Sequence, residues 1–166
     1  MCMENNAHSH SNNCCKQKTS YCGHGCCNHE QLPNLSEYEK ELLRLAAKEK
    51  LLPVGRFLLK SSRSSHLEAV AYSPVYITDK LDDMSTVHTN ARFLNRLQEH
   101  GLVTLNYDEP LESYDYEFFY ESSAYEYFTE TVREGKQNQG FIFDTAIFEL
   151  GHIALTGSGQ DLATSL

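Results

Sequence analysis

The apolar positions of residues 78–107 predict a helix followed by a strand. Four aliphatic residues recur at helical spacing and define the buried face of a helix over 85–100: Val87, Ala91, Leu94 and Leu97. Ser85 is expected to cap this helix, because its hydroxyl can accept a hydrogen bond from a free amide of the first turn. Gly101 ends the helix where a left-handed residue is least costly. The apolar run 102–107 then predicts a strand.

The segment before this region predicts further helices. Ser36 and Glu39 have the spacing of a capping box, which predicts a helix from 36 to about 52, and Pro53 stops it. The apolar group in 54–60 is interpreted as a short second helix. Residues 66–76 fit a strand or a helix. Thr78 is expected to cap a short helix over 79–83.

The segment after residue 107 mixes strands and helices. Aromatic and acidic residues alternate over 113–120, which predicts the returning strand of a hairpin with 102–107. Ser123 and Glu126 form a second capping-box pattern, and a helix is expected over 123–133. Residues 146–156 are rich in strand formers, and a short helix is expected in 160–163. The predicted fold class is therefore α+β.

Two stretches of this pattern resemble a winged helix-turn-helix domain of the bacterial transcriptional-regulator type. In 78–107 a helix, a glycine stop and a strand follow one another, and in 150–166 a strand leads through Leu-Thr and glycine into a helix. The resemblance implies a winged helix-turn-helix fold over 36–166 with an extended acidic, tyrosine-rich wing region. It also implies that helix 85–100 enters the major groove of double-stranded DNA.

The resemblance assigns DNA contacts to the polar face of that helix. Arginine reads guanine and asparagine reads adenine through paired hydrogen bonds. The implied contacts are His88, Asn90, Arg92, Asn95 and Arg96. Winged-helix regulators commonly form homodimers, and helix 123–133 with strand 146–156 offers surface for that.

The charge distribution favours a second hypothesis. The chain of 166 residues has a formal net charge of −9. Residues 106–166 carry twelve acidic groups but only Arg133 and Lys136 as cations, so this half would repel a phosphate backbone. The alternative to a DNA-binding transcriptional regulator is a non-enzymatic winged-helix module that binds protein and no DNA. Six of the ten tyrosines fall within 107–127, where they either pack the core or form a protein-contact surface.

Residues 1–35 predict a separate tail that forms no packed core. All six cysteines lie in the first 27 residues, among histidine, asparagine, serine and glycine. Thiolates and imidazoles bind zinc and other soft or borderline transition metals. The candidate ligands are Cys14, Cys15, Cys22, His24, Cys26, Cys27 and His29. Their spacing matches no zinc finger. The hypotheses are therefore a metal or redox sensor, a redox-labile tail, or a tail that scavenges metal.

The sequence predicts no enzyme and no membrane segment. It has no nucleophile elbow, no His-Glu-x-x-His and no dinucleotide fingerprint, and every thiol lies in the tail. No apolar run approaches the roughly 20 residues that span a bilayer, and no signal peptide is recognisable. A cytoplasmic location is expected. His66, His88 and His100 lack partners at ligand spacing, so no metal site is predicted in 36–166.

Overall fold

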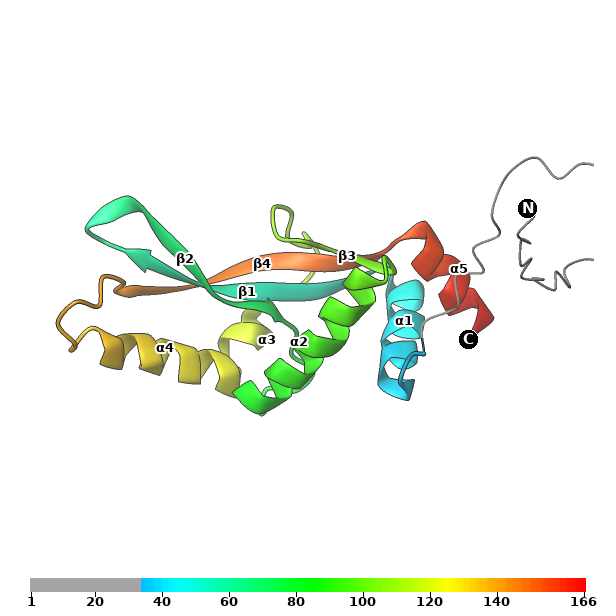
Figure 1. Cartoon of the computed structure of the whole chain (residues 1–166), viewed down its shortest axis with the longest axis horizontal. Helices are drawn as coiled ribbons and strands as arrows, with labels where there is room; N and C mark the ends of the chain where they lie inside the picture. Colours follow the sequence, from blue (N-terminus) through cyan, green and yellow to red (C-terminus); the bar gives the residue numbers. More distant parts are fainter. Residues whose placement is uncertain (1–33) are drawn as a thin grey trace, which may run out of the picture. The chain divides into compact units, whose positions relative to one another are not determined.

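Helices and strands are interspersed along residues 34–166, the part of the chain that the computed structural model describes (Figure 1). The helices are α1 (Glu37–Glu49), α2 (Met84–Glu99), α3 (Glu117–Tyr120), α4 (Ser123–Gly135) and α5 (Gly157–Ser165). The strands are β1 (Leu51–Ser61), β2 (Ser64–Val75), β3 (Val103–Asn106) and β4 (Thr145–Leu155). The fold class is mixed α+β, as the sequence predicted.

The strands form one antiparallel sheet in the order β2-β1-β4-β3. β1 lies in the middle and pairs with β4 without a break, from Leu51 opposite Ala154 to Lys60 opposite Thr145. Successive side chains of a strand point to opposite faces. The uninterrupted register therefore separates the apolar residues of β1 into two sets, one on each face of the sheet.

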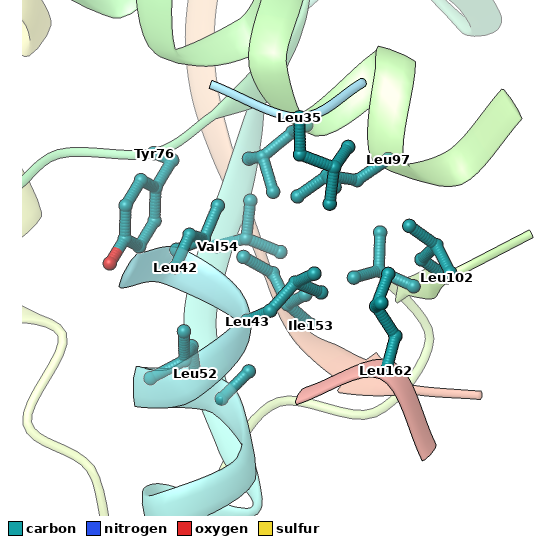
Figure 2. Packing of buried hydrophobic residues seen from close by; sticks show 13 residues of the cluster. Leu35, Leu42, Leu43, Leu52, Val54, Tyr76, Leu97, Leu102, Ile153 and Leu162 are labelled. Carbon is teal, nitrogen blue, oxygen red and sulfur yellow. The ribbon is translucent and has the colours of Figure 1, made fainter. Parts of the chain in front are cut away.

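The first core covers one face at the end of the sheet where α1 and α5 lie (Figure 1). Figure 2 shows aliphatic side chains of α1 meeting Val54 and Ile153 of the sheet. The buried members are Leu35, Leu42, Leu43, Ala46, Leu52, Val54, Tyr76, Leu94, Leu97, Leu102, Val103, Ile153 and Leu162. Each fully buried leucine contributes roughly 1.5–3 kcal/mol, so this core is a main source of stability.

The second core lies on the opposite face and is mostly aromatic. Phe57 of β1 stacks on Phe128 of α4 with ring centroids 4.5 Å apart, and Phe148 of β4 stacks on Phe119 of α3 at 5.2 Å. Its buried members are Phe57, Val75, Ile77, Val87, Tyr116, Phe119, Ala124, Phe128, Val132 and Phe148. The apolar face of α4, which the sequence offered for dimerisation, is therefore used within the chain.

Several predicted elements are confirmed, with shifted ends. Helices predicted over 36–52, 85–100 and 123–133 correspond to α1, α2 and α4, and the strands over 102–107 and 146–156 correspond to β3 and β4. The helix predicted in 160–163 is α5, which begins at Gly157.

The predicted ends of the helices are only partly confirmed. The capping box of Ser36 and Glu39 is present, and Gly101 has a φ of 66°. Asp83 rather than Ser85 caps α2, because its carboxylate accepts from the amide of Thr86 at 2.8 Å. Ser122 rather than Ser123 caps α4.

Two predicted helices are wrong. Residues 54–60 belong to β1, because their apolar residues serve both cores and so must point to both faces of a sheet. Residues 79–83 form a turn. There the Asp82 carboxylate accepts from the amides of Thr78 and Asp79 at 2.8 and 3.0 Å, and a side chain that bonds local amides in this way competes with helix formation.

The predicted returning strand over 113–120 is also wrong, because these residues form a loop and α3. Tyr116 and Phe119, three residues apart, both turn into the second core. β3 pairs with β4 instead. Among residues 34–166 the tyrosine-rich segment contributes no strand, and α2 follows the β1–β2 hairpin and a turn rather than a helix. The described fold therefore does not confirm a helix-turn-helix.

Candidate interaction surface

The exposed face of α2 carries three of the five predicted DNA contacts, His88, Arg92 and Asn95. The His88 ring packs edge-on against Tyr72, with centroids 4.4 Å apart. A hollow of about 190 Å³ lies on the same helix and is lined by Thr89, Arg92, Phe93 and Arg96. This face can donate hydrogen bonds, but it holds few cations for a phosphate backbone.

Asn90 is placed in the interior rather than on the exposed face of α2, with 5% of its surface exposed. Its side-chain oxygen accepts from the Tyr38 hydroxyl at 2.9 Å, and its side-chain nitrogen donates to the main-chain oxygen of Tyr76 at 3.1 Å. A buried amide with both ends in use cannot reach a base edge. Asn90 is therefore a structural bridge between α1, α2 and the end of β2, and its burial disfavours the predicted DNA contact.

Arg96 is also engaged within the chain. Its Nε lies 3.4 Å from Oε1 of Glu39, whose side chain is fully buried. Glu39 meanwhile accepts from the amide and hydroxyl of Ser36 through its other oxygen, at 2.7 Å each. No hydrogen bond reaches Oε1 within the described residues, so Arg96 supplies its positive partner. The guanidinium also donates to the main-chain oxygen of Asn34.

The predicted metal ligands all lie outside the described residues. They are Cys14, Cys15, Cys22, His24, Cys26, Cys27 and His29, and metal binding by the tail stays a prediction. Within residues 34–166 no three His, Cys, Asp or Glu side chains gather closely enough to hold an ion.

The six tyrosines of 107–127 divide between core and surface. Tyr116 is buried, and its hydroxyl donates to the oxygen of Gly151 at 2.8 Å. Tyr107 lies under the guanidinium of Arg56, 4.7 Å from ring centroid to Cζ, and Tyr125 packs against the second core. The other three are partly exposed, with exposed fractions of 37% for Tyr114, 43% for Tyr120 and 62% for Tyr127. The rings of Tyr114 and Tyr120 also pack edge-on against Phe119 and Phe148 of the second core.

Exposed acidic residues neighbour these tyrosines along the chain. We define the α3–α4 surface by the exposed residues Tyr114, Asp115, Glu117, Tyr120, Glu121, Glu126, Tyr127, Glu130 and Glu134. Among them Glu121 pairs with Lys80 and Glu130 pairs with Arg133. The remaining carboxylates have no ion pair within residues 34–166, so the surface keeps a net negative charge.

An apolar hollow of about 490 Å³ adjoins the α3 end of this surface. It is lined by Leu45, Glu49, Leu51, Leu52, Pro53, Tyr76, Ile77, Thr78, Tyr114 and Phe118. Burial, and then the nearby Tyr38 and Tyr114, raise the pKa of Tyr76 to about 12. The Tyr76 hydroxyl therefore stays protonated and can donate a hydrogen bond at neutral pH.

Sequence reasoning missed this hollow, which we call the α3 hollow. Its walls come from the end of α1, the start of β1, residues 76–78 and the loop before α3, and no local pattern joins these segments. Leu51 gave no signal, because the helix predicted over 36–52 included it, and only the structure shows that it is 39% exposed.

Comparisons with known proteins add no relative. No family model, curated protein or solved structure matches the chain. Among the helices of residues 34–166, none is both long and apolar enough to cross a membrane.

Proposed function

We propose that this chain is a protein-interaction module, not an enzyme, and that it binds a basic partner protein through the α3–α4 surface. The observation that carries the proposal is the exposure of Tyr114, Tyr120 and Tyr127 among carboxylates. Tyrosine offers a large contact area with a polar end, and aromatic residues are enriched at protein interfaces. A core role explains Tyr116 and, in part, Tyr114 and Tyr120, whose rings pack against Phe119 and Phe148. It does not explain Tyr127, which is 62% exposed.

The charge of the surface supports a protein partner over nucleic acid. Affinity for nucleic acid comes from lysine and arginine neutralising phosphates, and the α3–α4 surface presents carboxylates instead. A complementary partner would bring lysine or arginine toward these groups. Opposite charges increase the rate of encounter and disfavour wrong partners, so binding should weaken as salt rises.

DNA binding in a winged-helix-type arrangement is the second candidate function. It is favoured by the exposed Arg92 and Asn95 on α2 and by the succession of α2, Gly101 and β3, with β3 paired to β4. In this candidate α2 is the recognition helix. A homodimer and a metal- or redox-responsive tail would accompany it. The burial of Asn90 and the pairing of Arg96 with Glu39 weigh against it.

The test of the first candidate is quantitative capture of partners by the immobilised full chain from extracts of its source cells. The surface variant is Tyr127→Ser with Glu134→Lys, two exposed α4 residues seven apart and so on one side of the helix. Val70→Ser on β2 is the matched control, because Val70 is 54% exposed and remote in sequence. A partner lost with the surface variant and kept with the control supports the proposal. Equal capture by both variants contradicts it.

The two candidates separate in a mobility-shift experiment with a pool of random duplexes at low and high salt. DNA binding predicts a shift that weakens with salt and disappears in Arg92→Ala with Asn95→Ala. The interaction module predicts no shift at either salt concentration. The same α2 variant should then capture the partner protein as the wild type does.

A further inference from the structure

The α3 hollow has an aliphatic floor and aromatic walls. Leu52 and Ile77 are each 4% exposed and close the floor, whereas Leu51 at the rim is 39% exposed. Tyr114 and Phe118 form the side toward α3. Ligand sites in proteins are commonly concave and apolar, with a small number of polar groups that fix orientation. The α3 hollow has this composition.

Tyr76 supplies such a polar group. Its side chain belongs to the first core with 6% of its surface exposed. Figure 2 shows the hydroxyl on the side of the ring away from the aliphatic side chains. The hydroxyl makes no hydrogen bond to any residue of 34–166, and it is not fully buried. Tyr76 lines the α3 hollow, so its hydroxyl has a hydrogen bond available to a group that enters there.

The surroundings of the α3 hollow are acidic. Glu49 lines it, with Lys48 3.1 Å from its carboxylate. Lys80 lies 6.0 Å from the Phe118 ring centroid. Lys80 donates a hydrogen bond to the Glu121 carboxylate, and this bond, followed by the charges of Glu121, Glu117 and Asp115, raises the pKa of Lys80. Asp115 and Glu117 are exposed and adjoin the lining residues Tyr114 and Phe118 in the chain. The acids beside the α3 hollow are Glu49, Asp115, Glu117 and Glu121, against Lys48, Lys50 and Lys80. Glu49 pairs with Lys48 and Glu121 with Lys80, so Asp115 and Glu117 are the carboxylates without an ion pair within residues 34–166.

We propose that the α3 hollow binds one bulky apolar side chain of a peptide segment that carries lysine or arginine on both sides of that residue. The apolar side chain enters between Leu51 and Phe118, the Tyr76 hydroxyl donates to a main-chain oxygen of the segment, and the flanking cations face the carboxylates. This inference rests on the proposed function, because it specifies what the basic partner presents next to the α3–α4 surface.

The probe is the acetylated, amidated peptide Lys-Lys-Trp-Lys-Lys. The chain contains no tryptophan, so the emission of the peptide indole reports binding without background. A saturable shift of that emission to shorter wavelength is expected when the full chain is added, because the indole leaves water. Two comparison peptides test the apolar side chain and the flanking charges separately. Lys-Lys-Ser-Lys-Lys, which lacks tryptophan, is used as a competitor. Glu-Glu-Trp-Glu-Glu, which keeps tryptophan and reverses the charges, is followed by its own emission. Neither should bind measurably.

The variants place the site. Leu51→Ser should raise the Kd of the peptide about tenfold, as expected for losing one apolar contact. Tyr76→Phe should raise it about threefold to tenfold, as expected for losing one hydrogen bond. Leu67→Ser on β2 is the matched control, since Leu67 is also 39% exposed, and it should bind as the wild type does. Thermal unfolding verifies that each variant folds, and Leu45→Ser, at another lining residue that is 39% exposed, replaces Leu51→Ser if the latter does not.

Each outcome decides the inference. An emission shift that is equal in Leu51→Ser and wild type, no shift at all, or equal binding of the acidic peptide overturns it. In another outcome, Leu51→Ser leaves partner capture intact while the double variant Tyr127→Ser with Glu134→Lys abolishes it. This result contradicts peptide binding in the α3 hollow and still supports the proposed function. Capture that survives all of these changes removes the proposed function itself.

Discussion

Replacing Arg96 with methionine tests whether this residue stabilises the fold or is free to contact a ligand. The substitution keeps much of the side chain's apolar length and removes the charge that faces the buried Glu39 carboxylate at 3.4 Å. A carboxylate left in the interior without a partner is costly, because desolvation is no longer offset. We expect Arg96→Met to lower the free energy of unfolding.

The size of the effect follows from the exposure of the two partners. Removing one member of a buried pair costs about 3–5 kcal/mol, and exposed pairs contribute about 0–1 kcal/mol. Glu39 is fully buried, but the Arg96 side chain is 42% exposed and its charge is partly screened. The expected loss is therefore intermediate, about 2 kcal/mol.

Urea unfolding followed by far-ultraviolet circular dichroism measures this loss, with the slope m as a check that the transition stays two-state. Arg92→Met is the control, because Arg92 is exposed on the same helix and its replacement should change the free energy by less than about 0.5 kcal/mol. Adding Glu39→Gln to Arg96→Met should recover much of the loss, since the amide oxygen can still accept from Ser36. Equal stability of the Arg96 and Arg92 variants would refute the structural role of Arg96.

Three further predictions concern the segments that frame the α3 hollow and the sheet. Tyr116→Phe removes the hydrogen bond to Gly151 and should cost about 1–3 kcal/mol in urea unfolding. Gly151→Ala would place a methyl group 2.2 Å from the oxygen of Asn106, so β3 must shift, and thermal unfolding should show a loss of about 1–3 kcal/mol. Burial raises the pKa of Tyr76 from 10.0 to about 12, so the stability due to its protonated form is complete below pH 10 and is lost as pH rises toward 12. Between these two pH values the free energy of unfolding of the wild type should fall by about 2–3 kcal/mol more than that of Tyr76→Phe.

Helical periodicity and capping predicted the parts of this fold that are locally determined. In α2, Val87 and Leu94 repeat at the period of a helix and both are buried, and Gly101 takes the left-handed conformation that a helix end requires. Such features depend on neighbours in sequence, so they could be predicted from it.

The errors arose where distant segments decide the structure. The run 54–60 is apolar on both sides because β1 lies in the middle of the sheet with a core on each face, and an apolar run without period-2 alternation does not reveal this. The alternation over 113–120 indicated a strand, but Tyr116 bonds to β4 across the sheet face and the segment turns into α3. Both outcomes depend on partners more than 30 residues away.

The protein-contact surface stays a prediction, and the fold decides which residues could form it. The count of acids and tyrosines indicated a protein-contact surface, but only the fold separates the exposed Tyr127 from the buried Tyr116. The polar face assigned to α2 included Asn90 because helical spacing places it next to the exposed residues, whereas α1 and the end of β2 cover that side of the helix.

The most direct test of the account is hydrogen–deuterium exchange of the full chain, free and bound to the partner that it captures. Binding through the α3–α4 surface predicts that slowed exchange concentrates in residues 113–135, with α2 unchanged. Slowed exchange confined to α2, with residues 113–135 exchanging as in the free chain, would contradict the proposed function.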